Sequence, residues 1–211
     1  MRRFLILAHR VPTSGEFTLN DLAGGAGRMD EVARTVSTAF TLSNDLRRDT
    51  EMTVLFVAEP PPRSRRIDLV GARLRFLNPD ERSTGALLKN ALVRSVDFPR
   101  PFESSPGLTV APADPAVVMR EFLHQPNPVW LCEDGLRIEE WPSPGGHIAA
   151  VVSDPYDPTA EERELLAATG VPRVSVSPRS LRTSQVVDLV HHELDLREAA
   201  HADGSPPRAT G

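Results

Sequence analysis

The feature that most limits the possible folds is a regular alternation of strand-like and helix-like segments in the last third of the chain. Two apolar runs, HIAAVVS and PRVSVS, are each followed by a helical pattern, which begins at Thr159 in the first case and covers SQVVDLVHHELDL in the second. Nearly continuous apolar strands that alternate with helices of about 10 to 15 residues indicate a parallel sheet with helices on both faces. The sequence therefore predicts an α/β fold.

The earlier part of the chain fits the same class. Strands are expected at RRFLILAH, MTVLFVAE, residues 108–110 and PVWLCE. A helix is expected from Arg28, because apolar residues then recur on one helical face: Met29, Val32, Val36, Ala39 and Phe40. Two more helices should cover about 78–95 and 114–124.

Two helix starts carry local signals. Asn78-Pro79-Asp80-Glu81 offers a capping side chain, a proline at the first helical position and acids in the first turn. Thr159 and Glu162 have the spacing of a reciprocal capping box. We expect helices to begin at both places.

Composition narrows the class of protein. The chain has 211 residues, enough for one domain with a sizeable core, and its one cysteine, Cys132, rules out an internal disulfide. No run approaches the roughly 20 apolar residues of a membrane span. The net charge of -5 argues against a uniformly basic nucleic-acid binder, although a local basic face stays possible. We expect a soluble protein of the cytoplasm.

Three predicted strand ends share small polar side chains. They are WLCEDG after Trp130, VVSDPYD after Val152 and SVSPRSLRTS after Val174. Ligands of open parallel sheets bind beyond the carboxyl ends of the strands, so these segments would form one crevice if the strands are neighbours. The alternative is that each is an ordinary turn.

Several familiar sites are not indicated. No G-x-G-x-x-G or P-loop follows a predicted strand, and GGAG at 24–27 lacks that context. Neighbouring His191 and His192 point in different directions on a helix, which favours structural histidines over metal ligands. Ser43 and Ser153 have no histidine close in sequence to form a hydrolase triad.

The order of several segments resembles one known family. In order they are AGRMDEVARTVSTAFTLSNDLRRD, LNPDERSTGALLKNAL, SPG, VWLCEDG, VVSDPYDPTAEERELL and RVSVSPRSL. This series resembles the archaeal-type tRNA pseudouridine N1-methyltransferases of the SPOUT superfamily. The likeness covers residues 1–196, and its knot region would be about 128–196. Residues 197–211 are expected to form a disordered tail.

The resemblance implies a C-terminal trefoil knot, a homodimer and S-adenosylmethionine held by the knot loops, with no metal. Knotted chains are rare exceptions to the usual rules of chain connection. A dimer is also suggested by an apolar face of the final helix, which comprises Val186, Val187, Val190 and Leu194. The residues expected to bind the cofactor are Leu131, Ser153, Val176, Ser177, Pro178, Arg179, Ser180, Leu181 and Val186.

The resemblance also suggests residues for catalysis and substrate binding. Arg28 and Asp30 would stabilise the developing anion and assist proton removal; alternatively, Asp30 is only an acid well placed in the first turn of a helix. Arg47, Arg48 and Arg82 would bind phosphates or a nucleoside, or serve as ion-paired structural residues.

This chain departs from the family in the expected pocket. It has Ser153-Asp154-Pro155 where the family usually has Gly-Asp-His, and residues 182–186 read RTSQV in place of His-Ala-Asn-His-Cys. The leading prediction is N1-methylation of a pseudouridine in the T-arm of tRNA. Two alternatives remain: methylation of a small free heterocycle or C-nucleoside, and a catalytically inactive knotted module that binds RNA or protein.

Overall fold

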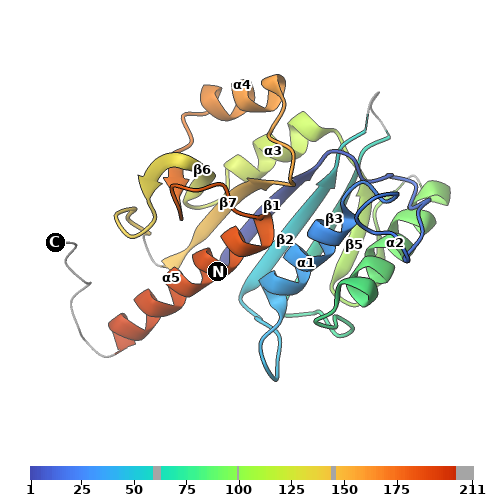
Figure 1. Cartoon of the computed structure of the whole chain (residues 1–211), viewed down its shortest axis with the longest axis horizontal. Coiled ribbons are helices and arrows are strands. Elements are labelled where there is room, and N and C mark those ends of the chain that lie inside the picture. Colours follow the sequence, from blue (N-terminus) through green and yellow to red (C-terminus); the bar gives the residue numbers. More distant parts are fainter. Residues whose placement is uncertain (59–62, 99, 144–145, 203–211) are drawn as a thin grey trace.

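The computed structural model describes residues 1–58, 63–98, 100–143 and 146–202 and contains one eight-stranded sheet in the order β4-β5-β3-β2-β1-β7-β6-β8 (Figure 1). The strands are β1 (Arg2–Ala8), β2 (Thr50–Phe56), β3 (Arg65–Val70), β4 (Phe102–Ser105), β5 (Leu108–Pro112), β6 (Pro128–Arg137), β7 (Ile148–Ser153) and β8 (Arg173–Ser175). The helices are α1 (Met29–Phe40), α2 (Glu81–Asp97), α3 (Pro115–Leu123), α4 (Ala160–Ala168) and α5 (Thr183–Ala202). The predicted alternation in the last third is confirmed.

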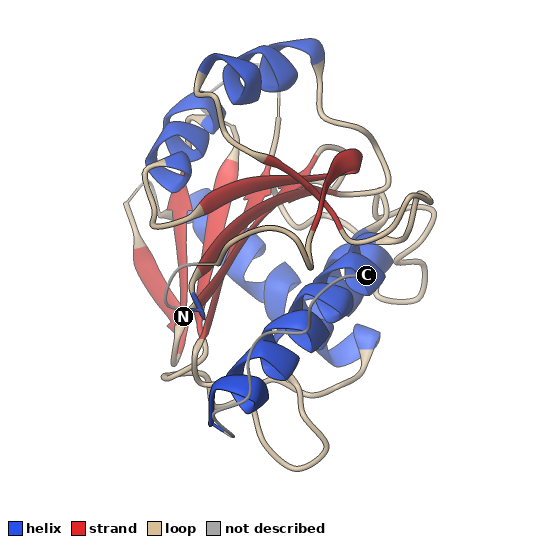
Figure 2. Ribbon diagram, turned by 90° about the vertical axis from the view of Figure 1, so that its left-hand side faces the viewer, coloured by secondary structure: helices blue, strands red, loops and turns tan. Residues whose placement is uncertain are grey.

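Helices cover both faces of the sheet, as the sequence predicted. Side chains of β1 alternate between the faces: Phe4 and Ile6 pack in the cluster that includes α1, α2 and α5, whereas Leu5 and Leu7 pack against α3 and α4. Figure 2 shows the sheet between these two groups of helices. Every residue of β1 except Arg3 is buried, because the strand is central and covered on both sides.

The sheet is mostly parallel, as the sequence predicted, with an antiparallel part at one edge. β2, β1, β7, β6 and β8 are parallel, but β3, β5 and β4 pair antiparallel. The connections explain the difference. Parallel neighbours need a crossover of about a dozen residues or more, and neither the β2–β3 link nor the turn at 106–107 is that long.

The start of α4 agrees with its prediction, whereas α2 begins later than predicted. Thr159 accepts a hydrogen bond from the Glu162 backbone, and the Glu162 side chain accepts one from the Thr159 backbone, so the predicted capping box is confirmed. At α2 the cap is Asp80, which accepts from the Ser83 N–H at 2.8 Å. The helix therefore begins at Glu81, later than the expected start at Asn78.

β8 passes between two parts of β6. Val174 of β8 is paired with both Leu131 and Leu136, which lie on either side of a bend in β6. The bend needs glycine, since a Cβ on Gly135 would lie 2.5 Å from the Val174 backbone nitrogen. A C-terminal segment enclosed by an earlier one is consistent with the trefoil knot that the resemblance implies.

The last helix differs from its prediction in two ways. It continues to Ala202, past the expected domain end at residue 196, and residues 203–211 of the predicted tail lie outside the described residues. The face proposed for dimer contact belongs to the core of the monomer, because Val187, Val190 and Leu194 are buried there. That face therefore gives no support for a dimer.

Among the described helices, none is long and apolar enough to cross a bilayer.

A buried carboxylate joins the starts of α1 and α5. One oxygen of Glu31, a residue only 1% exposed, accepts hydrogen bonds from the Ser184 backbone N–H at 2.9 Å and the Ser184 hydroxyl at 2.7 Å. The other oxygen lies 2.6 Å from Arg34 Nη1. Glu31 thus satisfies a free N–H at the first turn of α5 and places a negative charge at the positive end of that helix.

Replacement of Glu31 should destabilise the fold. Glu31→Gln keeps the shape but loses the charge, so the free energy of unfolding should fall by about 1–3 kcal/mol. Urea denaturation measures this free energy of unfolding. Glu164→Gln on the exposed side of α4 is the control and should stay within about 0.5 kcal/mol of the native chain. Equal stability of both variants would contradict the role given to Glu31.

Candidate functional site

The three strand ends expected to form a crevice do lie together. β7, β6 and β8 are neighbours in the sheet, and their carboxyl ends line a pocket of about 440 Å³. That volume is within the roughly 300–1,000 Å³ of small-molecule sites. The predicted crevice is confirmed, and the Ser153-Asp154-Pro155 corner forms one of its walls.

Most of the predicted cofactor residues line this pocket. Those in its wall are Leu131, Ser153, Val176, Ser177, Arg179, Ser180, Leu181 and Val186, whereas Pro178 is not part of the lining. Asp154, Pro155, Arg182 and Thr183, which were expected in the pocket as positions where the chain departs from the family, also line it. Lining residues that were not expected individually are Trp130, Cys132, Glu133, Val152, Asp157 and Pro158. Their positions next to predicted strand ends were a signal that could have identified them.

Hydrogen bonds hold the corner after β7 in shape. The Ser153 hydroxyl donates to the Tyr156 carbonyl, and the Tyr156 N–H donates to Asp154 Oδ1 at 3.1 Å. The Thr183 hydroxyl donates to the Ser153 carbonyl at 2.5 Å. The corner is therefore a closed turn that is also attached to the start of α5.

His9, at the end of β1, connects two buried carboxylates behind the pocket wall. Its Nδ1 lies 3.0 Å from Asp154 Oδ1, and its Nε2 lies 2.9 Å from Glu162 Oε2. Burial alone would lower the pKa of His9, but the hydrogen bonds to the two carboxylates outweigh it and raise that pKa to about 9. Although burial opposes it, the bond to His9 lowers the pKa of Glu162. A charged imidazolium thus holds the corner against α4.

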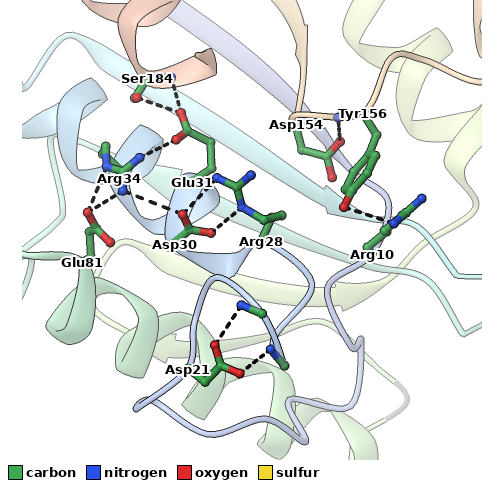
Figure 3. A network of polar contacts seen from close by, with 12 residues as sticks. Arg10, Asp21, Arg28, Asp30, Glu31, Arg34, Glu81, Asp154, Tyr156 and Ser184 are labelled. Atoms are coloured by element: carbon green, nitrogen blue, oxygen red, sulfur yellow. Dashed lines mark hydrogen bonds and ion pairs between the residues drawn. The ribbon is translucent and has the colours of Figure 1, made fainter.

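Arg28 and Asp30 lie together at the edge of the pocket (Figure 3). Arg28 Nε and Nη2 donate to the two oxygens of Asp30 at 2.9 and 3.1 Å. Arg28 lines the pocket and has a φ of 71°, an uncommon value for a residue other than glycine. Asp30 lies behind it. Burial would raise the pKa of Asp30, but the Arg28 hydrogen bond outweighs that and holds the pKa below its usual value.

None of the three arginines expected to bind substrate lines this pocket. Arg47 forms a two-bond ion pair with Asp195 on α5, at 3.0 and 2.6 Å. Arg48 donates to two backbone carbonyls of the turn after β3 and pairs with Asp45, and Arg82 donates to the Leu19 carbonyl at 3.0 Å. Their contacts match the structural alternative for these residues.

His191 has a structural position. It is buried beside Phe4, with ring centroids 5.2 Å apart, and its Nδ1 lies 3.1 Å from Arg2 Nη1. Burial is the main cause that lowers the pKa of His191, to about 3, so the ring is neutral. His192 is exposed on another side of α5. Within the described ranges, no group of three or more His, Cys, Asp or Glu side chains could hold a metal ion.

Known proteins resemble the chain over almost its whole length. A family model described as "Putative SAM-dependent RNA methyltransferase" matches residues 1–199. A protein of Methanocella arvoryzae named tRNA (pseudouridine(54)-N(1))-methyltransferase is 38% identical over 93% of this chain and 100% of its own length. A Pyrococcus abyssi protein of the same name is 32% identical over 92% of this chain and 98% of its own length.

A solved structure shares the fold. It is described as Archaeoglobus fulgidus Nep1 bound to S-adenosylhomocysteine, and it matches with a TM-score of 0.62 over 93% of this chain and 98% of that one. The sequence identity is 13%, so this likeness concerns the fold alone. It supports the predicted α/β fold.

The charge on His9 should make stability depend on pH. The folded pKa of about 9 lies above the usual value of 6.5, so the stabilisation is fully present below pH 6.5 and is lost as pH rises through 9. Urea unfolding between pH 6 and 9.5 should show this decline. His9→Gln should flatten it, whereas His201→Gln, an exposed control, should keep it. An unchanged profile in His9→Gln would contradict the charged state.

Proposed function

The chain belongs to the family of SAM-dependent RNA methyltransferases, and from that premise we propose that it methylates N1 of a pseudouridine in the T-arm of tRNA. The observation that carries the proposal is a donor-sized pocket made by the three strand ends that the family resemblance marks as cofactor loops. Full-length similarity to relatives named for this activity supports it. The reaction uses RNA, and the free thiol of Cys132 requires no oxidising compartment, so we propose that the protein acts in the cytoplasm.

The pocket suits S-adenosylmethionine in its chemistry as well as its size. Leu131, Val176 and Leu181 offer apolar surface for the adenine ring. Ser177 and Ser180, in the loop 176–182, have small side chains that let backbone donors and acceptors approach the edge of a bound ring. In the proposed complex the cofactor supplies a methyl group on a positively charged sulfur, and the enclosing loops align it and exclude water.

The chain's own contribution to methyl transfer would come from Arg28 and Asp30. The N1–H proton of pseudouridine is lost to solvent, a bond forms between N1 and the methyl carbon, and the bond from that carbon to sulfur breaks. Arg28 is placed to stabilise negative charge on the base as the proton leaves. Asp30 is a weak base because its pKa is lowered, so its role is to hold the Arg28 guanidinium by two hydrogen bonds.

We also propose that the protein is a homodimer, as the resemblance implies. The buried valines of α5 cannot form the interface, but Leu189 and Leu196 lie two turns apart on the same helix and are 37% and 47% exposed. A second copy of the chain would cover them. Dimer formation would thus use the outer side of α5.

Light scattering should give a mass near twice the 23.1 kDa of one chain. Leu189→Glu with Leu196→Glu should shift that mass toward one chain, because two like charges would then face each other across the interface. Val93→Glu, at an exposed site on α2, is the control and should leave the mass unchanged. A native mass of one chain would contradict the dimer.

A bulky side chain in the corner should block the donor. Ser153→Trp should abolish S-adenosylmethionine binding in calorimetric titration, because Ser153 lines the pocket and an indole would fill it. Ser43→Trp, on an exposed loop, is the control and should bind the donor as the native chain does. Thermal melting of both variants separates a filled pocket from an unfolded protein. Normal donor binding by a folded Ser153→Trp would contradict the assigned site.

A further inference from the structure

An aromatic ring and an arginine lie beside the donor pocket and have no role in the mechanism so far. Tyr156 follows the corner after β7 and is the chain's one tyrosine. Arg10 follows β1. The Arg10 guanidinium carbon lies 3.8 Å from the centre of the Tyr156 ring, and Arg10 Nη1 donates to the Tyr156 hydroxyl at 3.1 Å.

Both residues are held next to Arg28. A Cβ on Gly27, whose φ is 61°, would lie 1.9 Å from the Arg10 carbonyl oxygen, so the segment before Arg28 packs directly on the Arg10 backbone. Asp154 and Pro155, which directly precede Tyr156, line the same pocket as Arg28. Figure 3 shows Arg28 with Asp30 on one side of this region and Tyr156 with Arg10 on the other.

The position of Tyr156 is set by the donor pocket itself. Its backbone N–H and carbonyl bond to Asp154 and Ser153, two residues of the pocket wall. The ring is half-buried and does not line the donor pocket. The ring is therefore held at a fixed place next to the wall of the pocket proposed for the donor.

Arg10 is suited to exchange partners. It is exposed, and no carboxylate pairs with it in the part of the chain that the structure describes, unlike Arg28, which is fixed by two bonds to Asp30. Stacking on a ring is a weaker attachment for a guanidinium than two bonds to a phosphate. An incoming nucleotide could thus take over both the ring face and the arginine.

We propose that Tyr156 is the platform on which the target base stacks after leaving the RNA helix, and that Arg10 moves from the ring to the phosphate next to that base. The inference rests on the proposed RNA methyltransferase function and specifies the acceptor half of its site. Unstacked bases in RNA are commonly held by an aromatic ring together with arginine contacts to the backbone. In this chain the Arg10 guanidinium stacks on the Tyr156 ring when no RNA is bound.

The test compares steady-state methylation of a T-arm stem-loop RNA containing pseudouridine with donor binding measured by calorimetry. Tyr156→Leu removes the ring and should lower kcat/KM for the RNA about 5- to 150-fold, the range expected for one lost stacking contact. Tyr156→Phe keeps the ring and should be close to the native chain. Donor Kd should be unchanged in both variants.

The proposed phosphate contact of Arg10 is tested by the salt dependence of RNA binding. Arg10→Gln should weaken RNA binding and reduce the slope of log affinity against log salt by about one phosphate contact. Arg120→Gln, at an exposed site on α3, is the control and should keep the native slope. An Arg10→Gln slope equal to the native slope would overturn the phosphate role.

The outcomes separate this inference from the function on which it rests. If the native chain methylates the RNA and Tyr156→Leu does so with equal kcat/KM, the platform is overturned alone. If both Tyr156→Leu and Tyr156→Phe lose donor binding, the Arg10–Tyr156 contact only shapes the donor pocket. That result also overturns the platform. If the native chain binds the donor but methylates no RNA, the proposed function fails and the platform fails with it.

Discussion

The site depends on one buried carboxylate, Glu31, more than on any other single group. It binds the first turn of α5, and α5 begins where the loop 176–182 of the donor pocket ends. The residue before it on α1 is Asp30, which holds Arg28 at the pocket edge. A charge in the interior is costly unless it is fully bonded, and Glu31 meets that condition through Ser184 and Arg34. The hydrogen bonds of Glu31 therefore link the start of α5, next to the loop 176–182, to the segment that carries Arg28.

A second buried set of charges holds the opposite wall. His9 lies between Asp154 and Glu162, so the end of β1, the corner after β7 and the start of α4 are joined by one imidazolium. Both clusters act by the same physics: groups that would be costly alone become stabilising when hydrogen bonds satisfy them. The pocket thus has a polar network on each side, and in the proposed complex these networks would hold its walls in place for the donor.

The sequence was informative where the signals are local. Continuous apolar runs and the Thr159–Glu162 box placed the last strands and helices, and the series of family segments placed the pocket. It was uninformative where the deciding contact is distant. His9 meets partners at positions 154 and 162, and nothing near His9 in sequence indicates them. Arg47 resembled a phosphate ligand, yet Asp195 on α5 is its partner. Either Asn78 or Asp80 has a side chain that can cap a helix, and in the structure the cap is Asp80, which accepts a hydrogen bond from the Ser83 N–H.

In the proposed reaction this chain methylates a ring nitrogen that only a C-linked nucleoside exposes. The most direct measurement is transfer of labelled methyl from S-adenosylmethionine to two T-arm stem-loop RNAs that differ by pseudouridine or uridine at one position. In uridine that nitrogen carries the ribose and has no proton to lose. The account predicts label in the pseudouridine RNA alone, at N1 of that base. Equal labelling of both RNAs, or of neither while the donor binds, would contradict it.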